Sequence, residues 1–389
     1  MISHILKLIW NKKSNNSLLI IEIFLSFLVL FAVLSYVIYN TDRLSITTGF
    51  ETENRWLIYL DRNNDGMDST AIAEMKTTLK RELRAMPNIE AVSFTNGVGP
   101  YSNNTWQSSS DDMGFEIFSR YVYADEDFEE TMGINVIEGR WFEEDDVNAT
   151  YEPMIVNEFF MNEYFPDKSM VDSIILFDGD KRVVGVIDDY RYNGIFEEPV
   201  STSFFLQPHT AERASIVYLK LSPNTPKTFE EEVSKTVESI TKSSSFVIQD
   251  LSAMERRNSR ETWIPMIALL SISGFLCINV ALGLFGVLWY NINNRRSEIG
   301  LRRALGASRQ SIASQFTGEV LMLTVLAVLV GIFFAVQVPL LKLIDIPPVI
   351  FYRSMLYSAL IILTIVVICA LYPSAQASRI QPATALHED

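Results

Sequence analysis

Four long apolar segments constrain this chain more than any other feature. They cover residues 18–40, 264–290, 316–341 and 355–373. Each is long enough to cross a hydrocarbon layer of about 30 Å as an α-helix that rises about 1.5 Å per residue. The segment 264–290 carries no charged side chain at all. We therefore expect a membrane protein with four transmembrane helices.

The first apolar segment could also be a cleaved signal peptide. Its apolar core is longer than the roughly 7–15 residues typical of such peptides, and bulky residues rather than a small-residue cleavage site occupy positions 36–40. We expect a retained membrane anchor. The preceding residues 1–17 alternate apolar and basic side chains, which predicts an amphipathic helix on the cytoplasmic membrane surface.

Charge sorts the connecting segments between the two sides of the membrane. Residues 41–263 contain 21 Lys and Arg against 41 Asp and Glu, a net charge of −20, whereas the remaining residues have a net charge of +5. Short loops rich in Lys and Arg stay in the cytoplasm. Both termini (1–17 and 374–389) and the connector 291–315 are therefore predicted to be cytoplasmic. Residues 41–263 and the short loop 342–354 are predicted to lie outside, and the acidity argues against a nucleic-acid partner.

The outer segment alternates strand-like and helix-like patterns. One β-α-β unit is predicted from a strand at 55–60, a helix capped by Ser69 that ends at Pro87, and a strand at 89–95. A second unit follows far downstream, with a strand at 215–221, a helix at 228–242 and a strand at 246–248. The intervening residues favour short strands at 120–123, 154–156, 173–177 and 182–187. We expect an α+β domain with halves 41–114 and 207–260 and a mostly-β inserted subdomain 115–206.

The connector after the second apolar segment carries five arginines and ends on a Gly-Ala-Ser step. Pro265 is placed in the first turn of the second span, which we expect to continue as a helix through the arginines. Gly306 suits a helix C′ position, and Ser308 can cap the next helix. Leu301 and Leu305 share one helix face. This connector either holds the loop inside by charge alone or also docks a cytosolic partner.

The motif RSEIGLRRALGAS at 296–308 resembles the signature of FtsX-like ABC transporter permeases. The C-terminal stretches YPSAQAS (372–378) and IQPATAL (380–386) resemble the matching end of that family. In the outer segment, GRWFEED (139–145), PMIVNE (153–158) and VVGVIDDY (183–190) resemble the MacB-type periplasmic domain. The likeness extends over essentially the whole chain, and the ordered set of motifs is more specific than any one of them.

This resemblance implies a permease of the mechanotransmission type, which pairs with a second permease subunit in a bacterial inner membrane. The halves 41–114 and 207–260 would be the porter part of a periplasmic domain, and the connector would be a coupling helix pressed on a cytosolic ABC ATPase. The residues that match the coupling motif, and therefore the predicted ATPase contacts, are Arg295, Arg296, Glu298, Ile299, Arg302, Arg303, Leu305 and Gly306.

No G-x-x-x-x-G-K-[ST] phosphate loop occurs in the chain, so we expect no enzyme activity here and ATP with Mg²⁺ on a separate subunit. The expected function is export or extraction of a hydrophobic or peptide-like substrate. A periplasmic adaptor or effector is a further candidate partner, and membrane lipids are expected neighbours. One alternative is an FtsX-like activator of a cell-wall hydrolase. Another is a membrane-anchored binding or sensor protein without an ATPase.

Other motifs offer no catalytic, cofactor or metal site. The stretch DRNNDG (61–66) begins like a calcium loop, but its twelfth position is Ile72 instead of Glu, and a plain turn is favoured. The acidic run at 142–146 is expected to be solvated, and the three histidines are scattered. Cys277 and Cys369 lie in apolar spans and are interpreted as packing residues.

Overall fold

The computed structural model describes residues 13–60, 68–97, 99–102, 105–111, 113–166, 168–243 and 245–377. Residues 1–12 of the predicted amphipathic segment, the stretch at 61–66 and the motif at 380–386 lie outside these ranges. The chain divides into two compact units. The helical unit comprises Met1–Asp42 and Trp263–Asp389, and the α/β unit comprises Arg43–Thr262.

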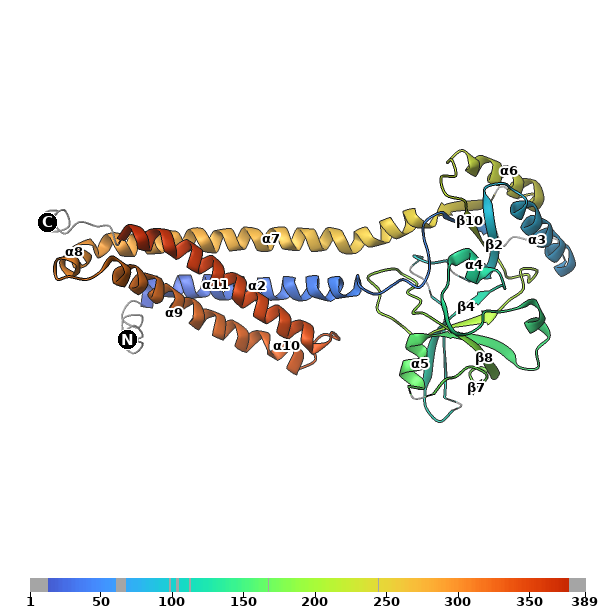
Figure 1. The fold of residues 1–389 in the computed structure, drawn as a ribbon, viewed down its shortest axis with the longest axis horizontal. Coiled ribbons are helices and arrows are strands. Elements are labelled where there is room, and N and C mark those ends of the chain that lie inside the picture. The colour runs from blue at the N-terminus through green and yellow to red at the C-terminus, as the bar shows by residue number, and fades with distance from the viewer. Residues whose placement is uncertain are drawn as a thin grey trace. The chain divides into compact units, whose positions relative to one another are not determined.

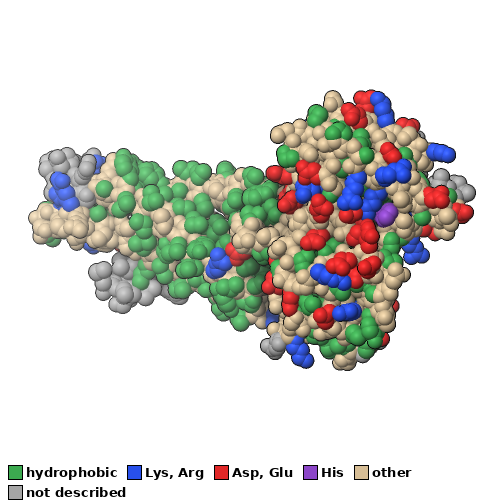
Figure 2. Space-filling model, turned by 45° about the vertical axis from the view of Figure 1, so that its right-hand side comes forward, with side chains coloured by type: hydrophobic (Ala, Val, Ile, Leu, Met, Phe, Trp, Pro, Cys, Tyr) green, Lys and Arg blue, Asp and Glu red, His purple; other side chains and the backbone are tan. Residues whose placement is uncertain are grey.

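Long helices make up the helical unit, and four of them are long and apolar enough to cross a membrane (Figure 1). This confirms the four predicted spans. Their apolar character is visible in Figure 2, where hydrophobic side chains cover most of the helical unit while acidic and basic side chains gather on the α/β unit. The helices are α2 (Lys13–Arg43), α7 (Leu251–Asn294), α8 (Arg296–Ala304), α9 (Arg309–Ala335), α10 (Gln337–Leu340) and α11 (Pro348–Ala377).

Each of the four spanning helices contributes at least one fully buried side chain to the core of the helical unit. Phe27 of α2, Leu284 of α7, Ala327 of α9 and Val366 of α11 have no exposed surface and belong to one apolar cluster. Lipid tails are as apolar as these side chains, so in a membrane the helices are held together by close packing instead of by the hydrophobic effect.

The second span differs from its prediction at both ends. α7 begins at Leu251, so Pro265 lies inside the helix instead of in its first turn. The residues before Pro265 carry good helix formers and no glycine, which lets the helix start earlier than the apolar run. The helix also ends at Asn294, because Arg295 adopts φ −112° and ψ 20°, so the arginine connector is a separate helix, α8.

One mixed sheet forms the backbone of the α/β unit, with strand order β11-β1-β10-β2-β4-β9-β6-β8-β5. β3 pairs with β4 and β7 pairs with β8 off this path. The strands are β1 (Arg55–Leu60), β2 (Ile89–Asn96), β3 (Gln107–Ser110), β4 (Ile117–Ala124), β5 (Val136–Gly139), β6 (Glu152–Asn157), β7 (Ile174–Leu176), β8 (Asp180–Ile187), β9 (Thr202–Leu206), β10 (Ile216–Leu221) and β11 (Phe246–Asp250).

The two predicted β-α-β units are present, but they interleave. β10 lies antiparallel between β1 and β2, and β1 lies antiparallel between β10 and β11. Each unit is therefore split by a strand of the other. Their helices, α3 (Ser69–Arg84) and α6 (Phe229–Thr241), contact each other and bury Leu79 and Val233 against the sheet.

The inserted residues extend the same sheet instead of forming a separate one. β4 continues from β2, and the parallel pairs β4–β9 and β6–β8 follow. The short helices α4 (Phe128–Met132) and α5 (Glu158–Tyr164) and the 3-10 turn η1 (Glu144–Asn148) connect these strands. Strands β3, β5 and β9 were not predicted. The N-cap of α3 is Asp68 instead of the predicted Ser69, because the Asp68 carboxylate accepts the hydrogen bond from the Ala71 amide at 2.7 Å.

Candidate functional site

The connector that joins α7 to α9 is the candidate site, and its backbone is closed at both ends. α8 ends with Gly306 at φ +97°, where the amides of Gly306 and Ala307 donate to the carbonyls of Arg303 and Arg302. This is a Schellman arrangement, which favours glycine at C′. Ser308 then caps α9 and accepts from the Ser311 amide at 3.1 Å. Both predicted punctuation roles are confirmed.

The inner face of α8 packs on α9. Ile299 is 3% exposed and forms a small apolar cluster with Ile312 and Phe316. The Arg295 guanidinium lies over the Phe316 ring, 6.0 Å from its centre, and pairs with Glu319 at 3.1 Å. These contacts fix the orientation of α8. The side chains of Arg295 and Ile299 therefore make contacts within the chain, and the partner contact stays a prediction for both.

The outer face of α8 is apolar and solvent-exposed. Leu301 is 52% exposed and Leu305 is 80% exposed. Between them on the helix, Arg302 pairs with Glu298 at 2.6 Å and donates to the Gln315 side chain at 2.7 Å. Two exposed leucines beside a charged rim form a surface that loses solvent contact favourably when a partner covers it. Leu301 was absent from the predicted contact set, although its i,i+4 spacing to Leu305 indicated it.

The remaining predicted residues differ in their exposure. Arg296 is exposed and Arg303 is half-buried. Gly306 shapes the turn and has no atom within 4 Å of the position of a Cβ. Of the eight predicted residues, Arg295, Ile299 and Arg302 contact α9 and Gly306 shapes the turn. Arg296, Glu298 and Leu305 are exposed, and Arg303 is half-buried.

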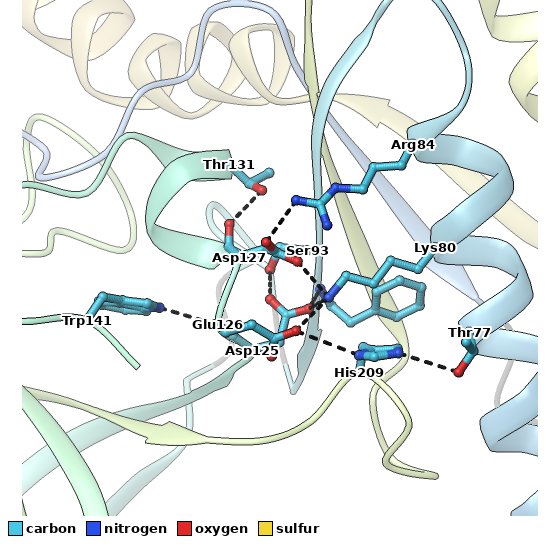
Figure 3. A network of polar contacts seen from close by, with 11 residues as sticks. Thr77, Lys80, Arg84, Ser93, Asp125, Glu126, Asp127, Thr131, Trp141 and His209 are labelled. Atoms are coloured by element: carbon cyan, nitrogen blue, oxygen red, sulfur yellow. Dashed lines mark hydrogen bonds and ion pairs between the residues drawn. The ribbon is translucent and has the colours of Figure 1, made fainter. Parts of the chain in front are cut away.

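A second polar cluster lies in the α/β unit, where carboxylates meet one buried lysine (Figure 3). The Lys80 ammonium of α3 is 3.2 Å from Asp125, 2.9 Å from Glu126 and 2.7 Å from Asp127. The three carboxylates lie close enough together to ligate a cation. The Lys80 amine, however, already supplies a positive charge at their centre. Asp125 also accepts from the Ser93 hydroxyl and the Phe94 amide. We interpret the cluster as a structural ion network.

Burial controls ionisation in this network. It raises the pKa of Asp125 to about 6, although the Lys80 charge and the hydrogen bond from Ser93 oppose the shift. Burial lowers the pKa of Lys80, but the carboxylates of Asp125, Asp127 and Glu126 outweigh it and hold that pKa above its usual value. Burial and then the Lys80 charge lower the pKa of His209.

Comparison with known families decides the classification. A model described as "MacB-like periplasmic core domain" matches residues 19–236, and one described as "FtsX-like permease C-terminal" matches residues 270–382. The chain belongs to the MacB-type, FtsX-like permease family. The motifs at 296–308 and 372–378 and the three outer motifs fall inside these matches, and the motif at 380–386 begins inside one. The predicted resemblance and the fold class of four spans plus an α/β periplasmic-type domain are confirmed.

Two curated relatives illustrate this permease family. The macrolide export ATP-binding/permease protein MacB of Bartonella quintana is 25% identical over 70% of this chain and 43% of its own length. An uncharacterized ABC transporter permease of Bacillus subtilis, YvrN, is 24% identical over 68% of this chain and 69% of its own. The chain thus spans less than half the length of that MacB protein.

Solved structures of transporter domains are also similar to part of this chain. The periplasmic region of MacB from Actinobacillus actinomycetemcomitans covers 53% of this chain and 92% of its own, with 15% identity and a TM-score of 0.37. The extracellular domain of YknZ from Gram-positive bacteria covers 50% and 100%, with 10% identity and a TM-score of 0.35. Membership of this permease family indicates a membrane subunit with an extracytoplasmic domain, and ABC permeases work with an ATPase.

Proposed function

We propose that this chain is the permease subunit of an ABC-type mechanotransmission transporter. In this proposal a separate cytosolic ATPase hydrolyses ATP with Mg²⁺, and its movement reaches the α/β unit through the spanning helices. The chain resides in a bacterial inner membrane with both termini in the cytoplasm. It acts beside a second permease subunit.

The outward face of α8 supports the proposal most directly. Leu301 and Leu305 are exposed on a short helix whose other face is fixed to α9 by Ile299 and Arg295. A rigidly mounted apolar face can transmit a push, whereas a loose loop would absorb it. Topology alone requires the positive charge of the connector, but it requires neither the closed turn nor this apolar face.

The substrate class rests on relatives. The MacB proteins that match are named macrolide exporters, which supports a hydrophobic substrate moved from the periplasm or outer leaflet.

Helix α7 also supports the proposed transmission of movement, because its 44 residues continue from the α/β unit into the membrane span without a break in the helix. A helix of that length transmits displacement along its axis.

Affinity purification of the tagged full chain from its native membrane tests the proposal. We expect co-purification of an ATPase that carries a phosphate-binding loop, identified by mass spectrometry and by Mg-ATP hydrolysis. Leu305→Asp and Arg302→Glu should reduce its recovery at least about tenfold, because each places an unfavourable charge in the contact.

Leu343→Asp provides the matched control. Leu343 is 64% exposed in the connector between the third and fourth spans, so this variant changes surface hydrophobicity equally without touching α8. It should retain full recovery. Undiminished recovery with Leu305→Asp would rule out the assigned contact face, and absence of any ATPase with the unaltered chain would favour a membrane-anchored sensor.

A further inference from the structure

One arginine of the α/β unit has no exposed surface and is surrounded by main-chain carbonyls. The Arg191 guanidinium donates to the carbonyl of Thr47 at 2.8 Å, of Arg43 at 3.2 Å and of Ile46. These three residues belong to the linker that leaves α2, here residues 43–50. Arg191 also donates to the carbonyls of Ile195 and Glu197 in its own loop, at 2.7 Å and 3.2 Å.

The loop that carries Arg191, residues 189–198, also contacts the linker through its backbone. The Arg191 amide donates to the Thr48 carbonyl at 2.9 Å. Gly49 has φ +80°, and a Cβ there would lie 2.0 Å from the Asp189 carbonyl oxygen. The linker therefore lies directly against the 189–198 loop, and only glycine permits that approach.

The start of α7 meets the same loop. Asn258 donates its side-chain amide to the Asn193 carbonyl at 2.5 Å. One turn earlier, Glu255 accepts a hydrogen bond from Thr52, just beyond the linker. The 189–198 loop thus contacts both segments through which the α/β unit is joined to membrane-spanning helices, the exit of α2 and the entry of α7.

The other side of the loop is bonded to the inserted strands. Glu197 pairs with Arg120 of β4 at 2.5 Å and accepts from the Asn193 amide. Asp189 accepts from the Phe159 amide of α5 at 3.0 Å. The loop is therefore the place where both membrane-linked segments and the β4 and α5 elements meet.

Desolvating a guanidinium is costly unless its donors are satisfied, and here five carbonyls satisfy it in a forked arrangement. A lysine would keep the charge, but its single nitrogen has three donors and cannot replace five bonds that are spread over three guanidinium nitrogens. We infer that Arg191 is a positioning residue that fastens the 189–198 loop to both membrane-linked segments, so that their displacement is passed to β4 and α5. The inference rests on the proposed function, because it assigns the route by which the ATPase stroke enters the α/β unit.

Hydrogen exchange of the full chain in lipid nanodiscs tests this inference without a partner. In Arg191→Lys we expect amides in residues 43–50 and 189–198 to exchange about tenfold faster or more, because the forked bonds are lost. Amides of β1, β2 and β10 should keep their rates. Unchanged exchange in the linker, or equal acceleration throughout the sheet, would overturn the inference.

A second variant and a functional readout keep the test decisive. Should Arg191→Lys not accumulate, Asn258→Ala removes one contact at the entry of α7, and exchange must then accelerate in residues 189–198 while β10 stays unchanged. With the co-purified ATPase, ATP and vanadate should alter exchange of β4 and α5 in the unaltered chain but not in Arg191→Lys, although both retain the ATPase. An equal response in both overturns the inference and leaves the α8 contact intact. If no ATPase co-purifies with the unaltered chain, the proposed function is contradicted. The exchange rates measured without a partner then still test whether Arg191 positions the 189–198 loop.

Discussion

The Lys80 ammonium lies 3.2 Å from the Asp125 carboxylate, and the side chains of both residues are buried, at 9% and 0% exposure. Asp125 directly follows β4 and Lys80 belongs to α3, so the pair joins the inserted strands to one β-α-β unit. Neither charge could remain buried alone without a large desolvation cost.

Replacing Lys80 by Met should therefore destabilise the α/β unit strongly. It leaves three neighbouring carboxylates, one of them fully buried, without their cation, and removal of one partner of a buried pair costs about 3–5 kcal/mol. We expect the melting temperature to fall by roughly 10 °C, as measured by the tryptophan fluorescence of the full chain in detergent. Lys235→Met removes a fully exposed pair with Glu231 and should not shift the melting temperature.

The raised pKa of Asp125 predicts a specific pH dependence. Its folded pKa of about 6 exceeds the usual 3.8, so between about pH 4 and 6 the folded state holds a proton that the unfolded state has lost. The contribution of Asp125 to stability therefore falls as the pH rises through this window. In Asp125→Asn this contribution disappears, so the stability of the variant relative to the unaltered chain should improve from pH 4 to pH 6.

The lowered pKa of His209 makes a contribution of the opposite sign, because the folded form of this side chain binds fewer protons than the unfolded form. His209 is present in both proteins, so the difference in melting temperature between them isolates Asp125. A difference that stays constant from pH 4 to pH 6 would show that Asp125 has an ordinary pKa.

Much of the fold could be predicted from local patterns because those patterns are local in origin. Apolar length predicts the spans, and alternation predicts strands such as β1 and β10. The interleaving of the two β-α-β units could not be predicted, because the placement of β10 between β1 and β2 depends on contacts over 100 residues apart in the sequence. Short strands such as β5, with one residue partly buried and three exposed, carry too weak an alternation to be recognised.

The candidate site shows where such prediction ends. At about 100° per residue, Ile299 and Leu301 lie on nearly opposite faces of α8. Helical geometry separates the faces, but only the turn at Gly306 determines which face meets α9. Arg191 gave no sequence signal, because its partners are main-chain carbonyls and several of them lie about 145 positions away.

Gly306→Ala should loosen the turn after α8. Gly306 has φ +97°, and nothing lies within 4 Å of an added Cβ, so the cost of about 1 kcal/mol comes from the backbone conformation alone. In this variant we expect faster hydrogen exchange at the backbone amides of residues 306 and 307, whose hydrogen bonds close the end of α8. In contrast, Gly318→Ala lies inside α9 with equally open space and should be neutral or stabilising by up to about 1 kcal/mol.

Close helix contact makes the opposite prediction for Gly331. A Cβ at this position of α9 would lie 2.4 Å from Cδ1 of Phe27 on α2, and Phe27 has no exposed surface into which it could rotate. Gly331→Ala should therefore destabilise the bundle by about 1–3 kcal/mol through overpacking, measured as a lower melting temperature of the full chain in detergent. Gly286→Ala, where an added Cβ meets nothing within 4 Å, serves as the control. Phe27→Leu should relieve the clash, so the double variant should be more stable than the sum of the two single losses predicts. Strict additivity would show that α2 and α9 do not meet at this pair.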